Sequence, residues 1–248
     1  IETEAAYYLT EIRRVQPHGP YYLSGHSRGG RVAYALAQQL RKEGEAVNLL
    51  ALFDASWPGA VRDELTTHSD GAFLLSFVAH LTQTARHGQH AQVAPLPRVD
   101  SQEGDTQEEE TTGNTSVLDD PYAEMVARLD ALSPEAQMRW VQEQLERWQI
   151  LPAGADARWV HGLFAVYKNN LHTDARYQPT ALAPLTVTLF AAQDQTGDSR
   201  RPTLAELVTG WSRFAEVEVK VVPGNHFSMM AAPNVYQLVA QLSPQLRT

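Results

Sequence analysis

Cysteine is absent from the 248-residue sequence, and so is any long apolar run. Without cysteine the chain has no disulfide bonds, thiolate metal ligands or cysteine nucleophiles, which fits a reducing compartment such as the cytoplasm. No segment approaches the roughly 20 consecutive apolar residues that a membrane-spanning helix needs. We therefore expect a cytoplasmic protein with no membrane partner.

The sequence has no cluster of basic residues, whereas its acidic residues are concentrated in one stretch. The net charge is −9, and eight of the 29 acidic residues lie between Asp100 and Asp120, where there is no Lys or Arg. Elsewhere 21 acidic residues nearly balance 20 basic ones. No basic stripe is therefore available for nucleic acid, and we expect no such partner. The acidic stretch has almost no apolar residues, which predicts a solvated, mobile loop over about 99–120.

Apolar runs and helical periodicities alternate at both ends of the chain. Apolar runs at 21–24 and 47–54 predict buried strands, and between them the apolar positions of 28–42 recur at helical spacing. Strand, helix and strand in succession form a βαβ unit, whose crossover is right-handed. Two further strands are predicted at 185–191 and 217–223, on either side of another helix. The pattern predicts an α/β fold with an open, mostly parallel sheet.

The middle of the chain differs from its ends. From about 60 to 182 it contains helical patterns and no convincing strand. This segment is too long for an ordinary connection and too aromatic for a linker. We therefore expect a core formed by 1–59 and 183–248, interrupted by a helical insertion at 60–182.

The sequence "GHSRG" at 25–29 matches the pattern G-x-S-x-G. It follows an apolar strand and directly precedes a helix, which is the context of a nucleophile elbow, a sharp turn that exposes a serine. Ser27 is therefore a candidate nucleophile, and the helix N-terminus behind it favours developing negative charge. Gly25 and Gly29 are expected because a side chain at either position would collide across the turn. The alternative is an ordinary strand-to-helix turn in which Ser27 only caps the helix.

A serine nucleophile needs a general base and a carboxylate that orients the base. His226 is the best-placed base because it follows the last predicted strand, at the edge where open α/β sheets bind ligands. Two acids compete for the third role: Asp54 ends the strand next to that of the serine, and Asp194 ends the following one. The chain order Ser, Asp, His holds for both, so the residues alone leave both open. No histidines show metal-ligand spacing with supporting acids, and we expect no metal site.

Three segments together resemble one family. They are "GPYYLSGHSRGGRVAYALAQQL" at 19–40, "LLALFDASWPG" at 49–59 and "VPGNHFSMM" at 222–230. In this order they resemble the thioesterase domains that end nonribosomal peptide and polyketide synthases, which belong to the α/β-hydrolase superfamily. The resemblance covers the chain from end to end and implies that the helical insertion is a lid. It favours Asp54 over Asp194, because the acid of that family commonly follows the strand after the nucleophile's.

The resemblance also implies a reaction and a partner. The substrate would be an acyl or peptidyl chain held as a thioester on the phosphopantetheine arm of a carrier protein, upstream in the same polypeptide. Ser27 would form an acyl-serine, and hydrolysis or macrocyclisation would release the product. The domain itself would bind no cofactor. The alternatives are another serine esterase or acyltransferase of the same fold, and a non-catalytic binding module that lacks a complete oxyanion hole.

Two further sets of residues carry expectations. The backbone N–H of Arg28 would serve the oxyanion hole, which needs no particular side chain. Its guanidinium would pair with a nearby acid, the alternative being a carboxylate or phosphate of the substrate. Aromatic residues of the insertion would line the lid and bind substrate, the alternative being that they pack the insertion's own core. These aromatic residues are Phe73, Phe77, Trp159, Phe164 and Tyr167.

The start of the chain departs from the family pattern. Hydrolases of this fold place several strands before that of the nucleophile, whereas about 20 residues precede it here and they predict one helix. A nucleophile strand without a neighbour on its other side would be an exposed apolar edge, which proteins avoid. We therefore expect that N-terminal strands are missing from this sequence and that it is part of a longer chain.

Overall fold

The protein has two compact units. Unit 1 comprises Ile1–Thr66 and Asn169–Thr248, and unit 2 comprises Thr67–Lys168. The structure is a computed structural model that describes residues 1–60, 69–88, 121–182, 185–194 and 202–246. The acidic loop predicted at 99–120 lies outside the described residues.

Unit 1 is built around a four-stranded sheet with the order β1-β2-β3-β4. The strands are β1 (Tyr21–His26), β2 (Val47–Phe53), β3 (Thr186–Ala192) and β4 (Glu216–Val222). Every neighbouring pair is parallel, so the predicted parallel α/β sheet is confirmed. The inner strands β2 and β3 are buried along almost their whole length, because helices cover both faces of the sheet.

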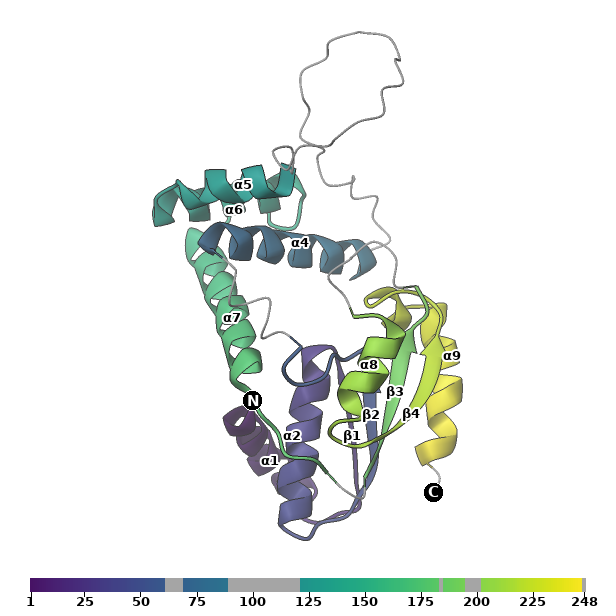
Figure 1. The fold of residues 1–248 in the computed structure, drawn as a ribbon. Coiled ribbons are helices and arrows are strands. Elements are labelled where there is room, and N and C mark those ends of the chain that lie inside the picture. The colour runs from purple at the N-terminus through teal and green to yellow at the C-terminus, as the bar shows by residue number, and fades with distance from the viewer. Residues whose placement is uncertain (61–68, 89–120, 183–184, 195–201, 247–248) are drawn as a thin grey trace, which may run out of the picture. The chain divides into compact units, whose positions relative to one another are not determined.

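Helices lie on both faces of this sheet (Figure 1). They are α1 (Glu2–Val15), α2 (Arg28–Lys42), α8 (Leu204–Trp211) and α9 (Asn234–Leu242), with short 3₁₀ helices η1 (Ser228–Met230) and η2 (Ser243–Leu246). Helix α2 connects β1 to β2 and α8 connects β3 to β4, so both connections step the same way along the sheet. Right-handed crossovers therefore put both helices on one face, and α9 packs on the other.

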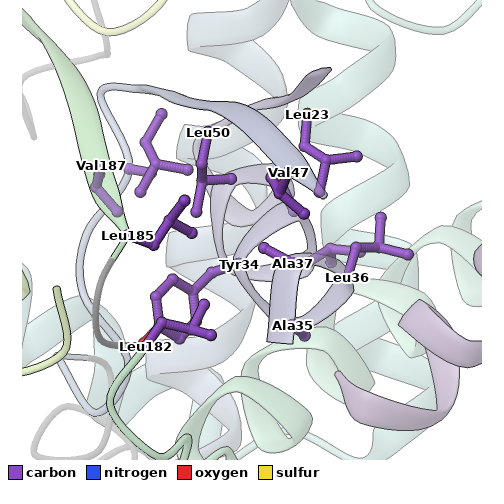
Figure 2. Packing of buried hydrophobic residues seen from close by; sticks show 14 of the residues in the cluster. Leu23, Tyr34, Ala35, Leu36, Ala37, Val47, Leu50, Leu182, Leu185 and Val187 are labelled. Carbon is purple, nitrogen blue, oxygen red and sulfur yellow. The ribbon is translucent and has the colours of Figure 1, made fainter. Parts of the chain in front are cut away.

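The larger core lies between the sheet and α2 (Figure 2). Successive residues of a strand point to opposite faces, so Leu50 and Leu52 of β2 face α2 while Leu49 faces α9. Tyr34 of α2 is fully buried beside Leu182. This packing fixes the carboxyl ends of the strands, where the candidate site residues stand.

Unit 2 is helical. Its helices are α4 (Asp70–Gly88), α5 (Pro121–Asp130), α6 (Pro134–Arg147) and the first part of α7 (Ala157–Arg176), which continues into unit 1. Residues 69–88 and 121–168, the described part of this unit, contain no strand. Their apolar faces enclose a small core that includes Leu74, Leu129 and Leu145. Among all helices described in either unit, none has the length and apolar character needed to cross a bilayer.

Candidate active site

Ser27 stands at the turn between β1 and α2. Its φ is 55° and its ψ is −125°, a backbone conformation that residues other than glycine rarely adopt. Two main-chain hydrogen bonds hold the turn: the Ser27 N–H donates to the Phe53 carbonyl at 2.9 Å, and the Gly30 N–H donates to the Ser27 carbonyl at 3.0 Å. Strained residues of this kind concentrate at functional sites, and a strand-turn-helix elbow is the context that the G-x-S-x-G motif requires.

Two glycines near Ser27 allow close backbone contacts. A Cβ at Gly25 would stand 2.1 Å from the carbonyl oxygen of Gly29, and a Cβ at Gly30 would stand 2.4 Å from the Cβ of Ala55. The prediction that Gly29 must also be glycine is wrong, because a Cβ there would have no atom of the described residues within 4 Å, apart from its two chain neighbours and the backbone of its own helix. At Gly29 the carbonyl, and not the Cα, faces the tight turn. The second constrained position is therefore Gly30.

His226 and Asp54 form a buried hydrogen-bonded pair. Nδ1 of His226 lies 2.8 Å from Oδ2 of Asp54, and the two residues are 8% and 3% exposed. The other carboxylate oxygen, Oδ1, accepts a hydrogen bond from the Ala192 N–H at 3.1 Å. An ionised carboxylate only accepts hydrogen bonds, so in a neutral imidazole Nδ1 carries the hydrogen and Nε2 is the nitrogen that can accept one.

The two acids that the sequence left as alternatives differ in their position relative to His226. Asp54 directly follows β2, and its carboxylate contacts His226. Asp194 lies two residues beyond β3 and is exposed, and its main-chain N–H donates to the Gly224 carbonyl at 2.9 Å. The backbone of Asp194 thus supports the turn that leads to His226, while the carboxylate beside the imidazole is that of Asp54.

Three strand ends bring these residues to one edge of the sheet. His26 pairs with Phe53 in the ladder between β1 and β2, so the next residues, Ser27 and Asp54, leave neighbouring strands side by side. His226 lies in the loop after β4, and its ring centroid is 4.5 Å from that of His26. The sequence patterns assigned no role to His26 and did not predict the contact between the two histidines.

The side chain of Arg28, the first residue of α2, pairs with an acid as predicted. Its Nη1 and Nη2 atoms donate to the two carboxylate oxygens of Glu4 at 3.0 and 2.7 Å, a bidentate arrangement that gives strong, directional ion pairs. The hydrogen bond from Arg28 lowers the pKa of the Glu4 carboxyl below its usual value. The pairing anchors the start of α2 to α1, directly behind the elbow.

A second ion pair, buried and not anticipated from the sequence, adjoins the first. Nη2 of Arg31 donates to Oδ2 of Asp174, near the end of α7, and Nη1 donates to Oγ of Ser56 at 2.6 Å. Oδ1 of Asp174 lies 3.1 Å from Nε of Arg28. Glu4, Arg28, Arg31 and Asp174 thus form a cluster of two positive and two negative charges, here called the four-charge cluster. It joins α1, α2 and the end of α7 within unit 1.

The chain matches a known protein family over nearly its whole length. The family described as "Thioesterase domain" matches residues 1–246, nearly the whole sequence. The chain belongs to the thioesterase domain family. The resemblance carried by the segments at 19–40, 49–59 and 222–230 is therefore confirmed.

Relatives of this thioesterase domain are parts of much longer proteins. Chondramide synthase of Chondromyces crocatus is 26% identical over 241 residues, which make up 95% of this chain and 5% of that protein. Malpinin synthetase of Mortierella alpina is 62% identical over 47 residues, which make up 19% of this chain and 1% of that protein. The chain therefore spans only a small part of the curated relatives that it matches.

Solved structures share the fold of this thioesterase domain. One is a four-domain nonribosomal peptide synthetase bound to AMP and glycine; it is 22% identical, with a TM-score of 0.72 over 100% of this chain and 16% of that chain. Another is the NocB thioesterase domain in covalent complex with a fluorophosphonate nocardicin G analogue. It is 19% identical, with a TM-score of 0.52 over 99% of this chain and 74% of that chain. These likenesses support the α/β-hydrolase-type fold predicted from the sequence.

The five aromatic residues expected to line a lid all lie in unit 2 of the thioesterase domain. Phe77 is 2% exposed, and its ring centroid lies 5.4 Å from those of both Phe164 and Tyr167. Phe73 is also buried, whereas Trp159 is 70% exposed. Phe77 and its two aromatic neighbours thus belong to the core of unit 2. A role in lining a substrate channel stays a prediction for all five.

We expect Phe77→Ala to lower the free energy of unfolding by about 3–5 kcal/mol, because the change removes a buried ring and leaves a cavity. Urea-induced unfolding measures this loss. Trp159→Ala is the control, since its ring is largely in solvent and the change should stay within about 0.5 kcal/mol of wild type. A Phe77→Ala variant with wild-type stability but a changed preference for acyl chain length would instead assign Phe77 to substrate binding.

Proposed function

We propose that this thioesterase domain releases an acyl or peptidyl chain from the phosphopantetheine arm of a carrier protein through an acyl-enzyme on Ser27. The observation that carries the proposal is the buried hydrogen bond between His226 Nδ1 and Asp54. It stands at the sheet edge where the elbow serine leaves β1. A serine, an imidazole and an orienting carboxylate at one site are the groups that nucleophilic acyl transfer needs.

The first half of the proposed reaction forms the acyl-enzyme. Nε2 of His226 accepts the hydroxyl proton of Ser27 while Oγ attacks the thioester carbonyl carbon, and Asp54 stabilises the imidazolium that forms. The main-chain N–H of Arg28, at the N-terminus of α2, donates to the developing oxyanion. The carbon–sulfur bond then breaks, and the imidazolium gives its proton to the departing pantetheine thiolate.

The second half releases the product. His226 takes a proton from water, or from an amine or hydroxyl group of the acyl chain itself, as that group attacks the ester carbonyl. The bond between the carbonyl carbon and Ser27 Oγ breaks, and the proton passes to Oγ. Water yields a free acid, and an internal nucleophile yields a macrocycle.

The names of the relatives support the choice of a carrier-bound thioester as the substrate. Chondramide synthase and malpinin synthetase are named for making a product, and the chain aligns with 5% and 1% of their lengths. A thioesterase segment within such a large synthase has the role of detaching the product. The proposed partner is therefore an acyl or peptidyl carrier domain upstream in the same polypeptide.

Covalent labelling followed by intact mass measurement tests the proposal. The full chain is incubated separately with an acyl-pantetheine thioester, a simple acyl ester of the same chain length and a fluorophosphonate. We expect a single adduct in the wild type and none in Ser27→Ala. Ser24→Ala is the matched control, because Ser24 is an exposed serine three residues away on β1, and it should label like the wild type.

Each other outcome points to a different function. Faster acylation by the simple ester than by the pantetheine thioester would support a general serine esterase. An adduct that persists in Ser27→Ala would assign the nucleophile elsewhere. A wild-type chain that no probe labels would support a non-catalytic binding module and would overturn the proposal.

A further inference from the structure

His26 contacts the main chain of His226 across the width of the sheet. Its Nε2 lies 2.7 Å from the carbonyl oxygen of His226. His26 is the last residue of β1, and His226 lies in the loop after β4, so the two come from opposite ends of the strand order. Neighbouring strands stand about 4.8 Å apart. The loop after β4 must therefore cross above the ends of β3 and β2 to reach His26.

The donor and the acceptor of this hydrogen bond follow from the chemistry of the two groups. A carbonyl oxygen accepts hydrogen bonds and never donates, so Nε2 of His26 must carry a hydrogen. The His26 ring also lies against that of His226, with 4.5 Å between centroids and 32° between planes. Separations in this range are typical of favourable contacts between aromatic rings. One side chain therefore holds both the backbone and the ring of His226.

Other contacts of His226 restrain the remaining directions. Nδ1 is held by Asp54, and the ring of Phe227 meets the imidazole edge-on at 4.9 Å and 85°. The loop itself is closed by Asn225, whose Oδ1 accepts from the N–H groups of Phe227 and Ser228. His26 directly precedes Ser27, so its contact connects His226 to the neighbour of the proposed nucleophile. It links the strand that carries the serine to the loop that carries the imidazole.

We infer that His26 is a positioning residue, which holds the imidazole of His226 in place relative to Ser27 through a hydrogen bond to the His226 carbonyl and through ring stacking. The inference rests on the proposed function, because it assumes that His226 is the base for Ser27. A displacement of a catalytic group by about 1 Å can cost about 10²-fold in rate. A side chain that fixes the base at both its backbone and its ring is therefore expected to affect acylation strongly.

Two substitutions separate the parts of this contact. His26→Phe keeps an aromatic ring but has no donor, whereas His26→Gln has no ring but carries an amide N–H₂ close to the position of Nε2. His161→Phe is the matched control, because it makes the same change at an exposed histidine on α7. The full chain is used for every variant, and thermal unfolding is measured for each.

Single-turnover acylation by an acyl-pantetheine thioester is the first readout. We expect His26→Phe to slow the acylation rate at saturating substrate by about 10²-fold, with little change in half-saturation. His26→Gln should slow it by no more than about tenfold, and His161→Phe should match the wild type. A wild-type rate in His26→Phe would overturn the inference. So would equal losses in the Phe and Gln variants accompanied by equal losses of melting temperature, because these would indicate a structural role only.

A second readout does not depend on activity. In the Ser27→Ala background, the proton on Nδ1 of His226 is observed by ¹H NMR, where its hydrogen bond to Asp54 shifts it far downfield. We expect this signal to broaden or vanish in His26→Phe and to remain in His26→Gln, and a sharp signal in both would overturn the inference. If the wild type forms no acyl-enzyme, the proposed function fails, and the NMR signal still decides whether His26 positions His226.

Discussion

Ser27→Ala and His226→Ala should each reduce turnover by roughly 10⁶-fold, and the double variant should be little worse than either single one. In the proposed mechanism the two groups act as a unit: a serine without its base is a weak nucleophile, and an imidazole without the serine has no proton to take in the first step. Each change therefore removes the same step. Steady-state turnover of an acyl-pantetheine thioester, with acylation followed separately in single-turnover experiments, measures the effect.

The exposed Ser24 provides a control for this prediction, and Ser24→Ala should retain wild-type turnover. The residual activity of the Ser27 and His226 variants should be the same, since it reflects substrate binding and the N–H donors of the oxyanion hole alone. A double variant that loses activity in proportion to the product of the single losses would mean that Ser27 and His226 act independently. That result would contradict the proposed acyl-enzyme mechanism.

Asp54→Asn should lower kcat by roughly 10³–10⁴-fold. The reason lies in the two hydrogen bonds of the Asp54 carboxylate. The Ala192 N–H donates to Oδ1, so an asparagine would keep its carbonyl oxygen there and turn its N–H₂ group toward His226. Nδ1 of His226 would then have to accept, which moves the imidazole hydrogen to Nε2 and leaves no lone pair there for the Ser27 proton.

Asp194→Asn is the matched control for this prediction, because it makes the same change at the end of the next strand. Its backbone contact to Gly224 is independent of the side chain, so we expect a loss of about tenfold or less. Measuring kcat for both variants with one thioester substrate decides between the two acids. If Asp194→Asn proves as damaging as Asp54→Asn, the assignment of the orienting carboxylate to Asp54 is wrong.

Local patterns predicted the inner strands of the sheet well, because strands buried on both faces appear in the sequence as nearly unbroken apolar runs. The run at 47–54 became β2 (Val47–Phe53), and the elbow serine stands between β1 and α2 as the motif indicates. The identity of the second constrained glycine was not predictable, because the motif records spacing and not which backbone atoms meet. Gly30 is constrained by Ala55, whose place is set by β2 and not by the turn.

Contacts between distant segments were beyond the reach of sequence patterns. His26 and His226 are 200 residues apart, and Arg31 and Asp174 are 143 residues apart. Neither pair has a local signal, because a histidine in a strand and an aspartate near the end of a helix are both ordinary there. Only the order of the strands and the course of α7 bring them together. The family resemblance directed attention to Asp54, whereas no comparable signal existed for Asp174.

Helix α7 belongs partly to each unit, which determines where segments of related domains can be exchanged without loss of stability. The helix begins in unit 2, yet its last turns, which carry Asp174, belong to unit 1. A graft that exchanged the whole helix would take Asp174 away with the donor segment and leave the buried Arg31 without its carboxylate. Removing one partner of a buried ion pair costs about 3–5 kcal/mol. A chimera joined within α7, at Asn169, would keep the four-charge cluster in the host. The best junction for exchanging the two units therefore lies inside a helix and not at its end.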